Sequence, residues 1–377
     1  MNENRENPKN RLARPGRLIV IAALVVIAWY GLIIMPTNYV VLQPGTAEAV
    51  KPMVQVKEGY SEEKGTLMLT TVRMTYANAI SYVLALMDSN ADILNKNQLF
   101  RSGESQSDYT KRQEFVMTNS QSNAIEAAYK KAGVPFHTEY EGIVVLQTLQ
   151  GFPAEQALQA GDRILEVNGT AVHRTEALLD LLKTYHVGDR VSVTYLRGDK
   201  EKTARIALGD LSKSGQGNSS ATNGGKQPAP HPGLGIAPAD LVHVQADDPG
   251  KQVTVNAGDI GGPSAGLMFS LEIYNRLVPE DITKGYRIAG TGEIDPQGNV
   301  GVIGGIRHKI VAADREGAEI FFSPKDLVFD NSKYPPILNY SDAVDQARKI
   351  HSGMKVVPVK TMDDALNYLR NLPPKAP

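Results

Sequence analysis

The chain has 377 residues, of which 42% are hydrophobic and 21% charged, and its 40 basic residues nearly balance its 41 acidic ones. This balance excludes a disordered chain, a collagen-like chain and a histone-like polycation, and it argues against nucleic-acid binding. The absence of cysteine excludes disulfides, thiol catalysis and Cys-ligated zinc, and the seven histidines form no HExxH motif. We therefore expect a globular protein of two or three domains with neither a metal nor another cofactor.

The amino terminus has the pattern of a membrane anchor. A leader, residues 1–17, carries five basic residues against two acidic ones, and residues 18–35 contain no charge. At 1.5 Å per residue such a helix spans roughly 27 Å of hydrocarbon, and Trp29 and Tyr30 lie near its far end, as at a membrane interface. Pro36 follows instead of a small-residue cleavage site, so we predict an uncleaved single-pass anchor in the plasma membrane. The basic leader places the N-terminus in the cytoplasm and everything after residue 36 outside.

Residues 36–132 form a mixed α/β region to which we assign no chemistry. The pattern predicts strands at 39–42, 54–56 and 66–72, with a turn at Pro44 and Gly45. A mainly helical stretch follows and ends before Gly133.

Residues 133–209 change to a β pattern. A strand begins at Gly142, a short helix precedes Gly161, and Asn168 and Gly169 form a hairpin turn between apolar segments. A helix over 175–185 and a strand over 190–196 complete this region.

These residues resemble a PDZ domain of the bacterial protease-associated kind, through the ordered pieces GIVV at 142–145 and AGDRILEVNGTAV at 160–172. The resemblance implies a β-rich domain with two helices that binds an extended peptide at a sheet edge. The predicted peptide-binding residues are Gly142, Ile143, Val144 and Val145. Glu141 precedes them and would disfavour a terminal carboxylate, so internal segments are the expected ligands. The alternative is a domain that only orients or gates its neighbour.

Residues 210–233 are rich in Gly, Ser, Asn and Pro, which is typical of a flexible linker. Gly225 and Lys226 only partly match a phosphate-binding loop, because Gln227 stands where Ser or Thr is required. The sequence offers no other Walker motif, so we expect no ATPase.

Ser264 lies in the segment DIGGPSAGLMF, where Pro263 suits a first helical turn. A serine at a helix N-terminus has unpaired backbone amides nearby, which can stabilise an oxyanion if the hydroxyl is a nucleophile. More commonly such a serine only caps its helix.

Lys309 lies in the segment GGIRHKIVAA, which predicts a helix with an apolar face. A partly buried lysine favours its neutral amine, and that amine can accept a proton from serine. Most helical lysines are simply solvated.

The blocks GPSAG at 262–266, TGE at 291–293 and GGIRHKIVAA at 304–313 together resemble the proteolytic domain of Lon peptidases, which use a Ser-Lys dyad. The resemblance implies Ser264 as nucleophile, Lys309 as general base and Thr291 as a hydrogen-bond partner of the lysine amine. Gly262, Pro263 and Ala265 are the predicted supporting and oxyanion-binding segment, in which amides near Ser264 hold the oxyanion. Many ATP-dependent members carry an acid where this chain has Gly261, and the role of the nearest acid, Asp259, stays open.

The whole chain is therefore similar to membrane-anchored Lon-like PDZ proteases of Gram-positive bacteria, of the SepM and YlbL type. We predict an α+β multidomain protein with a transmembrane helix at 18–35, a mixed region at 36–132, a PDZ domain at 133–209, a linker at 210–233 and a Lon-type α/β proteolytic domain at 234–377. The implied function is ATP-independent cleavage of exported peptides or unfolded proteins. Lon-type domains often form rings, so the resemblance also suggests a homo-oligomer.

Two alternatives remain at this stage. GPSAG also satisfies the GxSxG pattern of α/β-hydrolases, with His351 as the later histidine, although Pro263 is unsuited to that strained turn. His308 adjoins Lys309, but neighbouring helical residues diverge, so both cannot readily face Ser264. The other alternative is an inactive membrane-tethered scaffold.

Overall fold

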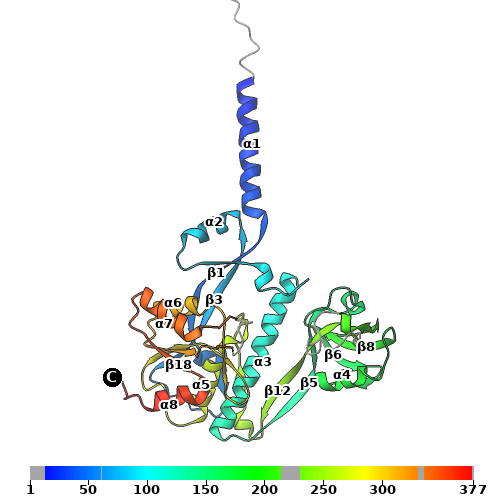
Figure 1. The fold of residues 1–377 in the computed structure, drawn as a ribbon. Helices are drawn as coiled ribbons and strands as arrows, with labels where there is room; N and C mark the ends of the chain where they lie inside the picture. Colours follow the sequence, from blue (N-terminus) through cyan, green and yellow to red (C-terminus); the bar gives the residue numbers. More distant parts are fainter. Residues whose placement is uncertain (1–12, 61, 214–229, 330–334, 376–377) are drawn as a thin grey trace, which may run out of the picture. The chain divides into compact units, whose positions relative to one another are not determined.

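The computed structural model describes residues 13–60, 62–213, 230–329 and 335–375. The chain divides into two units, one made of Met1–Pro44 and Val72–Leu99, the other of Gly45–Thr71 and Phe100–Pro377. Figure 1 shows the course of the chain through them.

The first unit contains the long helix α1 (Ala13–Ile34), the first part of strand β1 (Pro36–Ala49), helix α2 (Ala79–Met87) and strand β4 (Asp92–Asn95). β1 pairs antiparallel with β4 from Tyr39 to Leu42. Asn78 and Ser81 form a reciprocal capping box that begins α2.

Helix α1 covers most of the predicted membrane span, and the large apolar side chains described on it include exposed ones such as Leu18 at 67% and Val26 at 66%. In the part of the chain that the structure describes, no helix combines the length and hydropathy needed to cross a bilayer. The span at 18–35 therefore stays a prediction, and residues 1–12 of the leader lie outside the described residues.

The second unit is built on a parallel sheet. Strands β18 (Lys355–Val359), β17 (Ile320–Pro324), β14 (Arg287–Gly290) and β3 (Thr66–Asn78) lie in that order, with β1 beyond β3. The predicted turn at Pro44 and Gly45 is wrong, because β1 runs straight through both residues. Gly45 serves close approach instead, since a Cβ there would collide with the Thr71 side chain and carbonyl.

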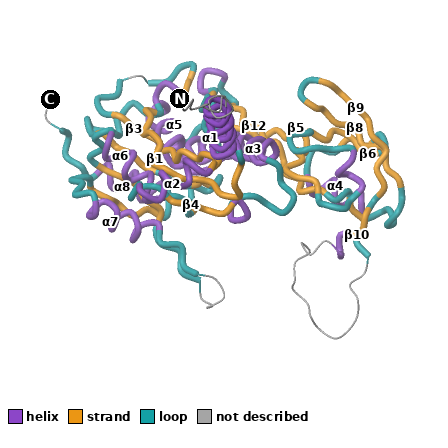
Figure 2. The backbone as a smooth tube through the Cα atoms, turned by 90° about the horizontal axis from the view of Figure 1, so that it is seen from above, coloured by secondary structure: helices purple, strands orange, loops and turns teal. Residues whose placement is uncertain are grey.

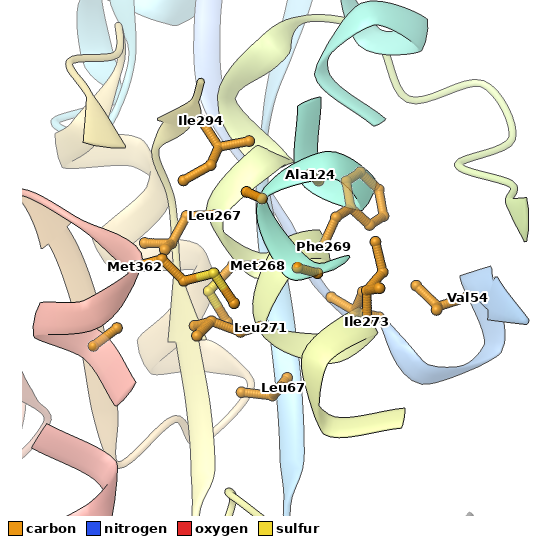
Figure 3. Close-up of a cluster of buried hydrophobic side chains, with 14 of the residues drawn as sticks. Val54, Leu67, Ala124, Leu267, Met268, Phe269, Leu271, Ile273, Ile294 and Met362 are labelled. Atoms are coloured by element: carbon orange, nitrogen blue, oxygen red, sulfur yellow. The ribbon is translucent and has the colours of Figure 1, made fainter. Parts of the chain in front are cut away.

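Alternate residues of these strands face two different helical layers. Leu67, Leu69 and Phe322 pack in one core with helices α3 (Gln106–Ala132), α5 (Gly266–Leu277) and α8 (Met362–Arg370). Met68 and Phe321 pack in another with α6 (Ile306–Arg315) and α7 (Asn339–Lys349). Figure 3 shows the first of these cores, in which α5 side chains gather with Leu67, Ala124 and Met362. The sheet is thus covered on both faces, as parallel sheets require.

The predicted PDZ region has its own core, which contains Ile143, Ile164 and Leu178. Its strands follow the order β12 (Ile236–Ala246), β5 (Phe136–Thr148), β6 (Arg163–Val167), β8 (Arg190–Arg197), β9 (Lys200–Ala207), and β7 (Thr170–Ala171) pairs with β6. Asn168 and Gly169 have positive φ between β6 and β7, which confirms the predicted hairpin. Of the two predicted helices, α4 (Thr175–Leu182) forms, whereas the first is only a 3-10 turn, Pro153–Gln156. Figure 2 shows β12 and β5 running side by side into this region.

Short elements complete the described part of the chain. Helix α3 begins at a Ser105 and Asp108 capping box and ends at Gly133, whose φ is 70°. The ends of the predicted linker pair with each other, while its middle, 214–229, lies outside the described residues. The remaining strands are β2 (Val54–Val56), β10 (Gly209–Asp210), β11 (Pro232–Gly233), β13 (Val253–Val255), β15 (Glu293–Ile294) and β16 (Val300–Gly301). The remaining 3-10 turns are Lys51–Met53, Lys96–Gln98, Leu211–Lys213, Pro249–Lys251 and Pro263–Ala265.

Gly65, which immediately precedes β3, offers a test of this packing away from any predicted site residue. A Cβ at Gly65 would collide with the Tyr286 carbonyl and lie 2.7 Å from the Tyr286 amide nitrogen. We expect Gly65→Ala to lower the free energy of unfolding by about 1–3 kcal/mol, because backbone cannot move aside as a side chain can. Urea denaturation measures the change. Gly353→Ala, which meets nothing within 4 Å, is the matched control, and equal losses in the two variants would contradict the packing described here.

Candidate active site

Ser264 lies in a tight 3-10 turn, Pro263–Ala265, that leads directly into α5. Gly262 precedes the turn with a φ of 89°, a conformation that favours glycine. Gly266 permits close packing, since a Cβ there would lie 2.7 Å from Ile294 and 2.7 Å from the Ser120 hydroxyl. The sequence-based placement of Ser264 at a helix N-terminus is confirmed by this geometry.

Lys309 is buried, with 3% of its surface exposed, although it lies on helix α6 of the opposite layer. Its Nζ lies 2.8 Å from Ser264 Oγ and donates to the Thr70 carbonyl oxygen at 2.6 Å. Burial lowers the pKa of Lys309 from its usual 10.5 to about 7. The two predicted dyad residues therefore meet, and the lysine can be neutral near physiological pH.

The dyad meets next to the carboxyl end of β14, an interior strand of the sheet. Thr70 Oγ1 donates to the carbonyl of Gly290, the last residue of β14. Helices α5 and α6 cover opposite faces of the sheet, which separates them. Ser264, which precedes α5, and Lys309, on α6, can therefore meet only where a strand between them ends. Crevices at the carboxyl ends of parallel strands are the usual sites of open α/β sheets.

Thr291 has a different partner from the one predicted. Its Oγ1 donates to the Ser264 carbonyl at 2.9 Å rather than to the lysine amine, and the Gly292 amide donates to the same carbonyl at 2.8 Å. Thr291 is fully buried. It therefore fixes the backbone of the nucleophile's turn, a positioning role that differs from the predicted contact with Lys309.

Helix α3 holds the same turn from the other side. The Gly262 amide donates to the Gln113 carbonyl at 3.0 Å, and Ser120 Oγ donates to the Pro263 carbonyl at 2.9 Å. The Gly262 amide is therefore already bonded to α3, and Pro263 has no N–H. Neither supplies an oxyanion donor in this arrangement, whereas the role of Ala265 stays a prediction.

Thr70, Gln113 and Ser120 are the site residues that sequence reasoning missed. All three lie in the region 36–132, to which we assigned no chemistry. Thr70 and Gln113 contact Lys309 and Gly262 through backbone carbonyls, which every residue type provides, so the residue pattern carries no signal for these contacts. Ser120 lies on the predicted helix, where one serine among polar neighbours is unremarkable.

The predicted peptide-binding residues pair with another strand of the same chain, a contact that the sequence did not predict. Gly142, Ile143, Val144 and Val145 lie in β5, and each pairs with a residue of the chain's own strand β12. β5 is thus an interior strand, because it also pairs with β6, and the outer strand on this side of the sheet is β12. Residues 142–145 therefore do not lie at an open sheet edge, which corrects that expectation. Glu141, predicted to disfavour a terminal carboxylate, pairs with Arg163 at 3.3 Å.

The α/β-hydrolase alternative does not fit this geometry. In that fold the nucleophile follows a strand of the central sheet, whereas Ser264 follows β13, which pairs with β2 outside it. His351 is exposed past the end of α7, and His308 is buried on α6. Asp259 is exposed on the loop before Gly262. Among the described residues, no group of three or more His, Asp or Glu side chains could hold a metal ion.

Two models of known protein families match parts of the chain. Residues 131–208 match the PDZ domain model, and residues 251–370 match the model of the Lon protease (S16) C-terminal proteolytic domain. Ser264, Thr291 and Lys309 all lie within the second match.

Several curated proteins are similar to parts of the chain. The Lon protease of Aster yellows witches'-broom phytoplasma is 28% identical over 29% of this chain and 12% of its own length. The Serine protease Do-like HtrA of Lactococcus lactis is 37% identical over 22% of this chain and 20% of its own length. The chain thus matches only a small part of these relatives.

Among solved structures, the PDZ domain of the SdrC-like protein from Listeria monocytogenes is 31% identical and covers 26% of this chain and 90% of its own, with a TM-score of 0.22. From the two domain matches, the chain carries a PDZ domain and a Lon-type C-terminal proteolytic domain.

Proposed function

We propose that this protein is an ATP-independent, membrane-anchored serine endopeptidase in which Ser264 is the nucleophile and Lys309 the general base. The observation that carries the proposal is the buried lysine amine 2.8 Å from the serine hydroxyl, with a pKa lowered to about 7. The match to a Lon-type proteolytic domain and the similarity to Lon and HtrA proteases support a serine protease.

The reaction follows from the geometry of the dyad. The neutral Lys309 amine accepts the Ser264 proton as Oγ attacks the scissile carbonyl carbon, which gives a tetrahedral oxyanion and an ammonium. The ammonium then protonates the leaving amine, and an acyl-enzyme remains. Water attacks this ester while the amine takes the water proton, and the proton returns to Ser264 as the acid product leaves.

Two contacts prepare the dyad for these steps. The Lys309 amine donates a hydrogen bond to the Thr70 carbonyl, 2.6 Å from Nζ. The lone pair of the neutral amine is then free to face Ser264. The paired donors of Thr291 and Gly292 hold the Ser264 carbonyl, so the nucleophile's backbone cannot rotate away. Such preorganisation avoids rearrangement at the moment of reaction.

The substrates in this proposal are peptides or unfolded protein segments on the outer side of the plasma membrane. The sequence has no Walker motif with which to drive unfolding. The uncharged run at 18–35, its basic leader and the exposed apolar surface of α1 support the anchor and its orientation. A ring-shaped homo-oligomer is part of the proposal by resemblance to Lon-type domains alone.

Removal of either dyad member should abolish cleavage. We expect the full-length protein in detergent, without ATP, to cleave an unstructured casein, and Ser264→Ala and Lys309→Ala to reduce the rate by at least ~10²–10⁴-fold. Time-resolved mass spectrometry gives the rates and the cut sites. Lys355→Ala removes a lysine from the exposed start of β18 and is the matched control, which should cleave as the parent does. Cleavage by Ser264→Ala at the parent's rate would refute the proposal.

The pKa of Lys309 predicts how activity depends on pH. Below about pH 7 the amine carries a proton and cannot act as a base, so log kcat/KM should rise with unit slope toward pH 7 and level off above it. An uncharged peptide substrate, assayed from pH 5 to 9, measures this profile. Lys309→Arg should be inactive throughout, because a guanidinium keeps its proton across this range. A profile with no inflection between pH 6 and 8 would contradict Lys309 as the base.

A further inference from the structure

Helix α2 turns an apolar face away from the small core on which it packs. Its nine residues, AISYVLALM, include no charged side chain. Ala85 is the buried residue of the helix, and it packs with Val41 of β1 and Ala77 of β3. The large apolar side chains on the rest of the helix surface are exposed. They belong to Val83, Leu84, Leu86 and Met87, which we call the α2 apolar face.

This distribution is the reverse of that in an ordinary surface helix. Such a helix packs its large apolar residues on the core and directs charged residues to water. In α2 the core side carries the small Ala85, whereas Leu84 is 61% exposed and Met87 is 82% exposed. A contiguous group of exposed apolar side chains indicates a surface that is covered by an apolar partner.

The α2 apolar face lies beside a second exposed apolar surface, that of α1. Both helices belong to the first unit, and they are in contact. Figure 1 shows α2 next to the end of α1 from which the chain continues into β1. Leu32 and Ile33, in the last turn of α1, are exposed. The apolar surface of the predicted anchor therefore continues onto α2.

Two contacts hold the start of α2 near the end of α1. Thr37 lies just after α1, and its Oγ1 donates a hydrogen bond to the Ala77 carbonyl at 2.6 Å. Ala77 directly precedes Asn78, the residue that caps α2. The rings of Tyr39 and Tyr82 lie 5.1 Å apart and join β1 to the first half of α2. Where α1 ends, α2 is thus fixed beside it.

Aromatic side chains lie at the same place. Trp29 and Tyr30 are exposed near the end of α1, and the exposed Tyr39 contacts Tyr82 of α2. Tyrosine and tryptophan are enriched where a bilayer meets water, because their rings are apolar and also carry a polar group. These residues therefore suit the depth at which an anchor leaves the membrane.

We propose that α2 is a second membrane contact, which lies in the interface of the outer leaflet with the α2 apolar face among the lipid acyl chains. The partner is a phospholipid bilayer rather than a second copy of the chain, because the face continues the apolar surface of α1. The inference rests on the membrane anchor in the proposed function and deepens it. A spanning helix and an interfacial helix together fix the orientation of the first unit on the bilayer, which one helix alone does not.

Quenching by lipids measures the depth of α2. The chain has no cysteine, so Leu84→Cys in full-length Ser264→Ala protein provides a single site for a nitrobenzoxadiazole label. The protein is reconstituted in vesicles of equal parts phosphatidylglycerol and phosphatidylethanolamine. The matched control is Leu179→Cys, which labels an exposed leucine on the charged helix α4. Lipids with a nitroxide near the headgroup should quench the Leu84 label at least about threefold more than the control, and iodide in water at least about threefold less.

A charge shows whether the protein, rather than the dye, places this site in lipid. Met87→Glu should reduce nitroxide quenching of the Leu84 label at least about twofold, because a carboxylate is costly in hydrocarbon. Met87→Leu should leave the quenching unchanged. Met87 is largely exposed, so neither variant disturbs the core beneath α2. Equal quenching in the two variants would contradict a membrane contact made by this face.

Trp29 separates this inference from the anchor on which it rests. It is the only tryptophan of the chain, so quenching of its fluorescence by brominated lipids in the unlabelled protein reports whether α1 is inserted. If Trp29 is not quenched, the anchor is refuted and this inference with it. If Trp29 is quenched but the Leu84 and Leu179 labels respond alike, the inference alone is overturned. Protection of the Leu84 label from iodide without nitroxide quenching also overturns it, because a protein partner then covers the face.

Discussion

The candidate site depends on the burial of one amine. Lys309 can act as a base only if water is kept from its ammonium, and the structure achieves this by placing it between two helical layers with 3% exposure. Desolvation lowers its pKa to about 7, and Thr70 and Ser264 are its two near neighbours. The three-layer arrangement is therefore required by the chemistry, since a solvated lysine at this position would stay protonated.

The machinery around this amine extends beyond the part that matches a Lon-type domain. Residues 251–370 contain the dyad and Thr291, but Thr70 comes from β3 and Ser120 from α3, both earlier in the chain. The turn that carries Ser264 is held by α3 on one side and by the segment after β14 on the other. Residues 45–71 and 100–132 thus form part of the site's frame.

The PDZ domain and the proteolytic domain share strands as well as a chain connection. β12 begins at Ile236, which packs against the PDZ core, and ends at Ala246, which packs in the core that contains α5. β5 likewise begins at Phe136 against that core and continues into the PDZ sheet. A long two-stranded ribbon therefore joins the two, and its hydrogen bonds satisfy backbone groups that an exposed sheet edge would leave unpaired.

Turns and helix ends that depend on only a few neighbouring residues could be predicted from the amino-acid sequence alone. These include the Asn168 and Gly169 hairpin, the end of α3 at Gly133, and the helix entry at Ser264. Ser264 and Lys309 were identifiable because their ordered blocks resemble a known family. Other contacts became visible only in the folded chain: Thr291 donates a hydrogen bond to the Ser264 carbonyl, Thr70 and α3 hold Lys309 and the Ser264 turn, and β12 pairs with β5. These contacts join segments far apart in the chain, often through backbone carbonyls and amides, which nearly every residue type provides and no local pattern distinguishes.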